Sequence, residues 1–278
     1  MKRKAYAKVN LGLRVLRKRK DNYHDLEMVM SSISLYDELT FKKNKLNIVR
    51  IINDIYPDNI VLKAANAFKE KYSIKQGVDI NIKKRIPSQA GLGGGSSDAA
   101  CTLIALNKLY KQNRSIYELL ALGNTLGSDV SFCLTNQMSF VSGKGEKIDL
   151  IDKKLKVYLV LVEPDFKCST KTIFENHIIE KSDDLTNLVE AIKKNDLKEI
   201  ASNIRNDLET TVNKLYDNKI SEIKELLIKN KALNASMTGS GSVVFGIFED
   251  KKTAKKAYLK LKKEMINYKL YLCKLRNN

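Results

Sequence analysis

The glycine-rich stretch PSQAGLGGGSSD, residues 87–98, has the composition of a phosphate-binding loop. Its four glycines fall within five positions, and glycine allows positive φ angles and close approach of the backbone to a ligand. The stretch lies between an expected strand at 78–82 and an expected helix at 96–110, whose free N–H groups and dipole favour anions. Ser96 and Ser97 add hydroxyl groups for phosphate oxygens or Mg²⁺, and either is a good N-cap. The stretch therefore predicts a cradle for the phosphates of a nucleotide.

Other motifs and a plainer alternative fit this stretch less well. A dinucleotide-binding fingerprint would begin at Gly91 and Gly93, but its third glycine position holds Ser96, and the acidic residue about twenty positions on, Glu118, falls in a helical pattern. No GK[ST] follows for a Walker loop, and the HRD and DFG sequences of protein kinases are absent. A mobile surface loop remains the plain alternative, although so many glycines weaken a loop that nothing fills.

Two charged residues could perform phosphoryl transfer beside such a cradle. A carboxylate can accept the proton of an attacking hydroxyl, and a cation can stabilise the oxyanion that develops. Asp129 lies in the small and apolar stretch LGSDVSF, and Lys8 lies in the strand-like run AYAKVNL. Each has a plainer reading, Asp129 as a helix cap and Lys8 as one lysine among many. A second glycine cluster at 237–242 is a tight turn between strands or a cover over the phosphates.

Composition limits the class of protein. The chain has 278 residues and a net charge of +18, but its lysines are spread along its whole length, so we expect no dedicated nucleic-acid surface. No apolar run is long enough to span a bilayer and no signal sequence precedes the first strand, so the expected location is the cytoplasm. The cysteines are far apart, which predicts free thiols and neither a zinc site nor disulfides: Cys101, Cys133, Cys168 and Cys273.

The elements that must position these residues alternate between strand and helix patterns, which predicts an α+β protein with a domain boundary near residue 153. We expect strands at 4–15, 28–41, 78–82, 138–140, 147–151, 157–162 and 268–275, and strand, glycine turn and strand over 235–248. We expect helices at 59–72, 96–110, 115–122 and 251–265, and several helices between 182 and 229.

Five segments together resemble the GHMP kinases in order and spacing. They are AYAKVNLGL at 5–13, DNYHDL at 21–26, PSQAGLGGGSSDAA at 87–100, LGSDVSF at 126–132 and TGSGSVVFGIF at 238–248. The resemblance implies a two-domain α+β fold. A domain like ribosomal protein S5 would span 1–152, with the glycine stretch and the catalytic pair, and a ferredoxin-like α/β sandwich would span 153–278. The AKVNL segment, the Tyr-His pair and the GLGGGSS glycines point to members that phosphorylate a cytidine diphosphate-linked methylerythritol.

The resemblance also implies roles for particular residues. Asp129 would take the proton of the substrate's 2-hydroxyl, and Lys8 would stabilise the anion. Mg²⁺ would be carried by the nucleotide, with no metal site on the protein. The residues implied for ATP lie in two groups: near the adenine, Asn59 and Lys84, and at the phosphates, Pro87, Gly91, Leu92, Gly93, Gly94, Gly95, Ser96 and Ser97. Those implied for the substrate are Asn10, Tyr23, His24, Thr170, Phe174, Gly239 and Gly241. Tyr23 and Phe174 would enclose the cytosine ring, and His24 would hydrogen-bond its edge.

The chain departs from the family pattern at two positions. Asn22 stands where the turn usually has glycine, and since asparagine tolerates the left-handed conformation, we expect the turn to persist. Ser131 stands where proline is frequent. Two alternatives stay open: another GHMP kinase, acting on a sterol precursor, a sugar or an amino-acid alcohol, and a nucleic-acid binder suggested by charge alone. Residues 176–233 carry no assigned role, and the sequence leaves monomer and homodimer equally open.

Overall fold

The computed structural model describes residues 1–53 and 59–276. The chain divides into two compact units, each of which collects segments that are distant in sequence. Unit 1 comprises Met1–Ala7, Leu35–Ser88 and Gly93–Asn136, and unit 2 comprises Lys8–Ser34, Gln89–Leu92 and Gln137–Asn278. The first two strands, β1 (Lys2–Lys18) and β2 (His24–Asn44), contribute to both units. The predicted domains, by contrast, are each continuous in sequence and meet near residue 153, and this boundary stays a prediction.

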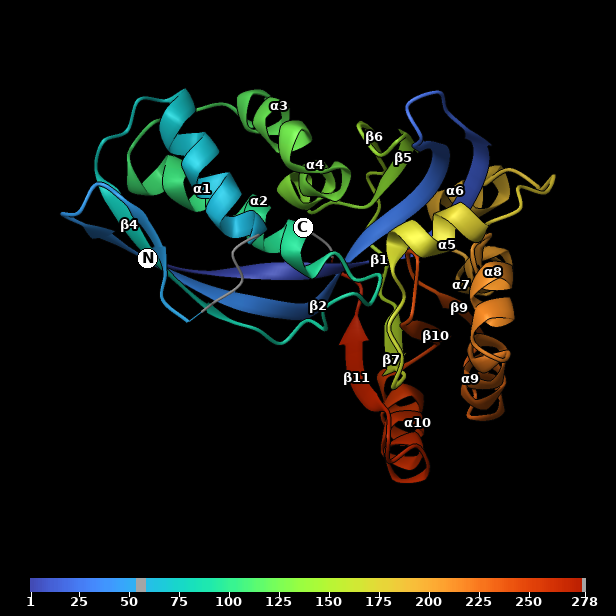
Figure 1. Ribbon diagram of the computed structural model, residues 1–278. Helices are drawn as coiled ribbons and strands as arrows, with labels where there is room; N and C mark the ends of the chain where they lie inside the picture. Colours follow the sequence, from blue (N-terminus) through green and yellow to red (C-terminus); the bar gives the residue numbers. More distant parts are fainter. Residues whose placement is uncertain (54–58, 277–278) are drawn as a thin grey trace. The chain divides into compact units, whose positions relative to one another are not determined.

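Unit 1 is a sheet with helices packed beside it (Figure 1). The second half of β2 pairs antiparallel with β4 (Gly77–Lys83), and β3 (Val49–Ile51) pairs parallel with β4. The helices are α1 (Ile60–Lys71), α2 (Gly94–Leu109), α3 (Ile116–Leu126) and α4 (Ser128–Thr135). In α1, the residues Val61, Ala65 and Phe68 of the face that the sequence period predicts are buried, and Ala64 is buried as well.

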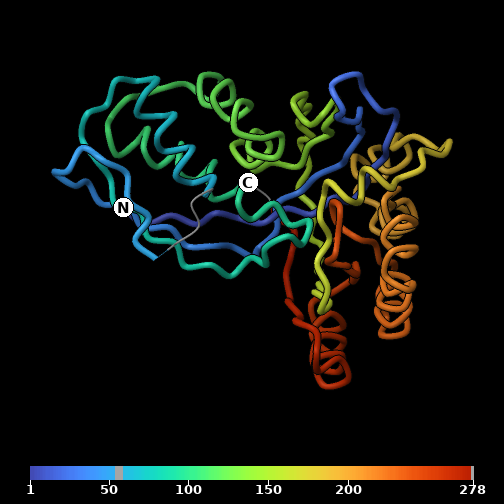
Figure 2. The backbone as a smooth tube through the Cα atoms, viewed as in Figure 1, coloured from blue at the N-terminus to red at the C-terminus, as the bar shows by residue number. Residues whose placement is uncertain are grey.

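The first part of unit 2 surrounds the hairpin formed by β1 and β2. Figure 2 traces the chain from β1 through a short turn into β2. The beginning of β2 pairs antiparallel with β5 (Ser139–Gly143), and β5 forms the predicted hairpin with β6 (Lys147–Leu150). On its other side β1 pairs parallel with β8 (Arg205–Asn206), a two-residue strand in a region where only helices were predicted. Asn22 adopts a φ of 62° in the turn, as expected for asparagine.

The second part of unit 2 is an antiparallel sheet in the order β11-β7-β10-β9, formed by β7 (Tyr158–Glu163), β9 (Asn234–Met237), β10 (Val244–Phe248) and β11 (Lys269–Lys274). Numbered by sequence, this order is 4-1-3-2, which confirms the predicted ferredoxin-like sandwich. Two helices pack on the sheet, α9 (Lys219–Lys229) and α10 (Lys251–Glu264). Four shorter helices precede them: α5 (Thr170–Asn176), α6 (Thr186–Lys194), α7 (Leu197–Asn203) and α8 (Glu209–Leu215).

Within residues 1–53 and 59–276, no helix is long and apolar enough to cross a membrane. The four cysteines are free and buried, as the sequence predicts.

Candidate active site

In unit 2, the lysine predicted to be catalytic lies in a buried polar cluster on β1. Lys8 is only 4% exposed, and its ammonium group donates to the Oδ1 atom of Asn10 at 2.7 Å. The backbone N–H of Lys8 donates to the carbonyl of Leu92 at 3.0 Å, which ties β1 to the glycine loop, defined here as residues 87–97. A buried ammonium group loses hydration and therefore requires partners of this kind. Of the residues predicted from sequence, the structure thus brings Lys8, Asn10 and Leu92 together.

A second glycine segment contacts this cluster. We call residues 238–242, which connect β9 to β10, the glycine turn. Its Thr238 hydroxyl accepts the N–H of Asn10 at 3.0 Å and lies 3.1 Å from the carbonyl oxygen of Gly91. Gly239 has a φ of 57°, and a Cβ atom there would lie 3.3 Å from the Lys8 ammonium nitrogen. Sequence reasoning assigned no role to Thr238, although it directly precedes the predicted Gly239.

Two more predicted residues lie at the glycine turn. The Thr170 hydroxyl, at the start of α5, is 2.9 Å from the Ser240 hydroxyl. Gly241 has a φ of 85°, and a Cβ atom there would lie 2.7 Å from the sulfur of Met237 and 3.2 Å from that of Cys168. The turn is therefore packed too tightly for side chains at its glycine positions.

The predicted base-recognition residues lie at the start of β2 and in α5. The His24 ring stacks on the Phe174 ring, with centroids 5.0 Å apart and planes inclined by 30°. Tyr23 is 58% exposed, and the Lys144 ammonium group lies 5.2 Å from the centroid of its ring. Burial, together with the charge of Lys18, lowers the pKa of His24 below its ordinary value of 6.5. Its imidazole is therefore neutral at pH 7 and offers one donor and one acceptor.

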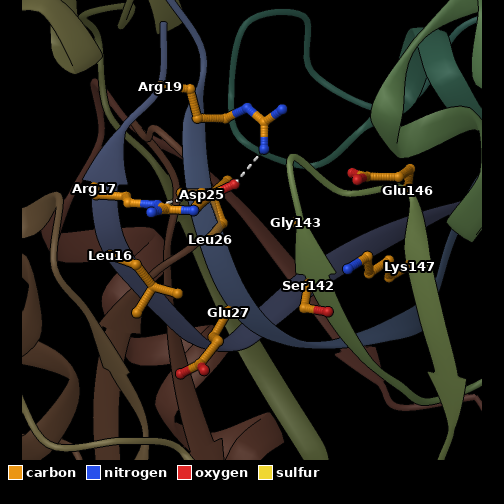
Figure 3. Close-up of a pocket in the computed structure, with 10 residues that line it drawn as sticks. All are labelled: Leu16, Arg17, Arg19, Asp25, Leu26, Glu27, Ser142, Gly143, Glu146 and Lys147. Carbon is orange, nitrogen blue, oxygen red and sulfur yellow. Dashed lines mark hydrogen bonds and ion pairs between the residues drawn. The ribbon is translucent and has the colours of Figure 1, made fainter.

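A pocket of about 490 Å³ lies beside the hairpin that carries Tyr23 and His24 (Figure 3). It is lined by Leu16, Arg17, Arg19, Asp25, Leu26, Glu27, Ser142, Gly143, Glu146 and Lys147. Arg17 and Arg19 each bind one oxygen of Asp25 at 2.6 Å, and together they lower the pKa of this carboxyl group, Arg19 more strongly. The backbone N–H of Arg19 also donates to the Tyr23 carbonyl at 2.8 Å, so these bonds fix the hairpin end that presents Tyr23.

In unit 1, the last residues of the glycine loop form the start of α2. The helix begins at Gly94, and its N-cap is Gly93, whose φ of 64° and ψ of 26° are left-handed. The predicted N-cap at Ser96 or Ser97 is therefore wrong, because the glycines themselves enter the helix. Ser97 is buried, and its hydroxyl donates to the Tyr6 carbonyl at 2.7 Å. Ser96, in the same first turn, is half-buried and lies among the first N–H groups of the helix, which have no partner within the helix.

The two ends of the glycine loop are joined by a buried ionic cluster that sequence reasoning missed. Asp37, fully buried on β2, accepts the backbone N–H groups of Arg85 and Ile86 and an ion pair from Lys84. Lys84 also donates to Asp98 in α2 at 2.7 Å. Lys84, predicted near the adenine, is thus anchored by two carboxylates, and half of its side chain still reaches solvent. Asp37 looks unremarkable in sequence because its partners are more than forty residues away.

Asp98 makes the stability of this cluster depend on pH. Burial, followed by the charge of Asp37, raises the pKa of Asp98 to about 7 despite the opposing charge of Lys84. The folded chain therefore holds this proton more tightly than the unfolded chain, whose carboxyl has a pKa of about 3.9. Hence the free energy of unfolding should fall by about 1 to 3 kcal/mol between pH 5 and pH 7, and Asp98→Asn should remove this slope.

Urea denaturation at pH 5, 6, 7 and 8 would measure this slope. Asp152→Asn is the matched control, because Asp152 is exposed and its substitution should leave the wild-type slope unchanged. Equal slopes in wild type and the Asp98 variant would contradict the raised pKa.

The remaining predicted residues of unit 1 lie at helix starts. Asn59 caps α1, with its side-chain oxygen accepting the N–H of Val61 at 2.7 Å. Asp129 lies half-buried in the first turn of α4. Pro87 is half-buried at the start of the glycine loop, and Gly95 lies in the first turn of α2, where a Cβ atom would meet Ile60 at 3.4 Å. Ser131, where proline is frequent in the family, donates to Asn124 at 2.5 Å.

Comparison with known proteins identifies the class. The GHMP kinases N terminal domain matches residues 59–144, and the GHMP kinases C terminal domain matches residues 188–267. A homoserine kinase from Cytophaga hutchinsonii has the same fold, with a TM-score of 0.75 at 18% identity over 97% of this chain and 94% of its own. The fold is therefore that of GHMP kinases, and the two domains match over residues 59–144 and 188–267.

Closer relatives narrow the class further. The 4-diphosphocytidyl-2-C-methyl-D-erythritol kinase of Caldanaerobacter subterraneus subsp. tengcongensis is 43% identical over 93% of this chain and 92% of the relative, and that of Clostridium novyi is 43% identical over 92% and 93%. A crystal structure of 4-(cytidine 5'-diphospho)-2C-methyl-D-erythritol kinase superposes over 100% of both chains, with a TM-score of 0.87 and 30% identity. The chain belongs to the 4-diphosphocytidyl-2-C-methyl-D-erythritol kinase family, whose members are ATP-dependent small-molecule kinases.

Proposed function

We propose that the chain transfers the γ-phosphoryl group of ATP to the 2-hydroxyl of 4-diphosphocytidyl-2-C-methyl-D-erythritol, giving the 2-phosphate and ADP in non-mevalonate isoprenoid precursor synthesis. The observation that carries this proposal is the buried Lys8 ammonium group, held by Asn10 next to the glycine loop and the glycine turn. A fixed cation beside a glycine-rich backbone suits a reaction that moves a phosphoryl group and generates negative charge. Full-length relatives at 43% identity support the choice of substrate.

In the proposed reaction, Asp129 accepts the proton of the 2-hydroxyl while its oxygen attacks the γ-phosphorus. The bond from that phosphorus to the bridging oxygen breaks, and ADP leaves with the bonding electrons. Lys8 stabilises the negative charge on the attacking oxygen, and Asn10 keeps the ammonium group in place. Positioning and charge stabilisation together provide most of the catalysis in such transfers.

The proposed nucleotide site is the glycine loop. Backbone N–H groups from Gly91 to Ser96 would bind the phosphates, with Asn59 and Lys84 near the adenine. Mg²⁺ carried by the nucleotide would neutralise charge on the β- and γ-phosphates. The described residues contain no cluster of three or more His, Cys, Asp or Glu side chains that could hold a metal ion, and Mg²⁺ carried by the nucleotide stays a prediction.

The proposed base site uses Tyr23, His24 and Phe174. The stack of His24 on Phe174 uses the face of the imidazole and leaves its edge for a hydrogen bond to cytosine. Tyr23 presents one ring face for stacking, while Lys144 lies over the ring as well. Thr170, Gly239 and Gly241 would line the pocket for the sugar alcohol. The cytoplasmic location and the absence of a nucleic-acid surface stay predictions.

The experiment that tests the function is a kinase assay with a substrate panel. The wild-type chain, with Mg²⁺ and ATP, should phosphorylate 4-diphosphocytidyl-2-C-methyl-D-erythritol and produce one ADP per product. Mevalonate, homoserine and a free sugar should show a kcat/KM lower by about 10⁴-fold, because a site built to hydrogen-bond a base edge rejects substrates without it. No product from the cytidyl substrate, or faster turnover of another alcohol, would reject the proposal in favour of a different GHMP kinase.

A further inference from the structure

A short segment of unit 2 contacts both the strand that carries Lys8 and the glycine turn. The segment is Asn206-Asp207-Leu208-Glu209, which runs from β8 into α8. It lies in the part of the chain to which the sequence assigned no role. Its three polar side chains all bond to the backbone of other elements: Asn206 and Glu209 to the end of β9 and the glycine turn, and Asp207 to β1.

Asn206 holds the carbonyl groups at the start of the glycine turn. Its side chain is 6% exposed, and its amide nitrogen donates to the carbonyls of Met237 and Gly239, both at 2.8 Å. Its amide oxygen accepts the N–H of Leu208 at 3.0 Å. Two carbonyl oxygens face one end of the amide and an N–H faces the other, so only one amide orientation satisfies all three groups. The side chain is therefore fixed, and it fixes Gly239 in turn.

Glu209 accepts hydrogen bonds from β9, the strand that leads into the glycine turn. One of its carboxylate oxygens accepts the backbone N–H of Met237 and the hydroxyl of Ser236, both at 2.7 Å. The other oxygen pairs with Lys224 in α9. Hydrogen bonds to a charged acceptor are stronger than neutral ones, so the end of β9 is held firmly.

On the opposite side, the segment is bonded to β1. In the parallel pair of β8 with β1, Asn206 lies opposite Leu13, and the N–H of Asp207 donates to the Leu13 carbonyl at 3.0 Å. The Asp207 carboxylate accepts the N–H of Val15 at 3.0 Å. β1 is the strand on which Lys8 and Asn10 lie, so one four-residue segment sets the spacing between that strand and the glycine turn.

We propose that Asn206 is a positioning residue for phosphoryl transfer: its amide holds the glycine turn at the distance from β1 at which Gly239 and Thr238 enclose Lys8 and Asn10. The proposal rests on the proposed role of Lys8. Asp207 and Glu209 anchor the segment, whereas Asn206 alone bonds to the turn itself. A displacement of about 1 Å in such a support can reduce turnover about a hundredfold without loss of the fold.

N206D tests this with almost no change in shape. The introduced carboxylate would face two carbonyl oxygens with no proton to donate, so its pKa should rise above that of an ordinary aspartate. Once protonated, the carboxyl can donate to one of the two carbonyls. We therefore expect kcat relative to wild type to fall about 10- to 100-fold at pH 8 and to recover several-fold at pH 6, with KM for ATP nearly unchanged.

N203D is the matched control, because Asn203 lies three residues earlier in α7 and donates only to the Glu199 carbonyl and to Ser202. Its kcat should equal that of wild type at both pH values. The folded fraction is measured by circular dichroism under assay conditions. If N206D is not folded at pH 8, N206S, which keeps one donor, takes its place and should lower kcat at unchanged folded fraction.

Wild-type kcat in N206D or N206S, or a loss that follows the folded fraction alone, would overturn the positioning role. Inactivity of the wild-type chain itself would instead reject the proposed function, so the two failures are distinguished.

Discussion

Asp129→Ala is expected to lower kcat by about 10² to 10⁴-fold, which is the usual contribution of a positioned general base. The carboxylate lies half-buried in the first turn of α4. Alanine leaves the helix intact, since it has the highest helix propensity, but no group then takes the proton of the substrate hydroxyl. Steady-state kinetics with the cytidyl substrate and Mg-ATP would measure the loss.

Asp129→Asn and Asp152→Ala separate the catalytic role from simpler ones. The asparagine variant keeps the shape of the side chain and should lose nearly as much kcat, because an amide is not a base at neutral pH. Asp152 is exposed and is not part of the proposed site, so its variant should retain wild-type kinetics. Binding of a fluorescent ATP analogue should stay within about threefold of wild type in all three, since the base acts on the other substrate. Near-normal turnover in Asp129→Ala would remove Asp129 from this role.

Several elements of the fold could be predicted from local sequence patterns, because residues close together in the chain determine them. The β-branched and apolar runs predict β1 and β2, and the helical spacing of Val61, Ala65 and Phe68 predicts α1. The glycine loop was located between a strand and a helix because glycine adopts left-handed conformations, such as that of Gly93, more readily than other residues. The 4-1-3-2 order of the second sheet was implied by resemblance and not by any pattern, since strand order depends on packing.

The features that were missed depend on contacts between distant residues. β8 has only two residues, too few for any period to show, and it exists because Gly12 and Leu13 of β1 offer it a partner. Asp37 lies inside a strand with an ordinary pattern, and its donors come from residues 47 to 49 positions further along. Likewise, the carbonyls that the Asn206 amide holds are 31 and 33 positions away, and the Asn10 N–H that Thr238 accepts is 228 positions away. Polar networks of this kind form only when the fold brings distant residues together, so no local sequence pattern predicts them.

Ser96 and Ser97 show how a local rule can fail at a binding loop. A serine before a helical pattern usually caps the helix, but here the helix starts two residues earlier, at Gly94. The cost of glycine in a helix is about 1 kcal/mol per residue relative to alanine. Leaving the first N–H groups without a side-chain cap exposes them to an external acceptor, which is what a phosphate-binding loop requires. The departure from the rule is therefore itself consistent with nucleotide binding.

Gly91→Ala is expected to cause a loss of kcat/KM of about 10² or more, together with a lower free energy of unfolding. Gly91 has a φ of 72°, and a Cβ atom there would lie 1.9 Å from the Thr238 carbonyl oxygen. Both obstacles belong to the backbone, so no side-chain rotation can relieve them. The glycine turn must move away, and with it the Thr238 hydroxyl that binds Asn10. Since Asn10 holds the Lys8 ammonium group, a single methyl group should displace the proposed cation.

Gly95→Ala shows whether the effect belongs to the position or to the loss of any glycine in the loop. A Cβ atom at Gly95 would meet only Ile60, at 3.4 Å, and alanine should stabilise the first turn of α2 by up to about 1 kcal/mol. In urea denaturation, Gly95→Ala should therefore have the highest free energy of unfolding, wild type the next and Gly91→Ala the lowest. This order should hold whatever Gly95→Ala does to nucleotide affinity. If Gly91→Ala were as stable and as active as wild type, the close contact between the two glycine segments could not be what holds Lys8 in place. The proposal that the glycine backbone positions the Lys8 ammonium group would then have to be abandoned, because the effect of a side chain at residue 91 is the most direct consequence of that proposal.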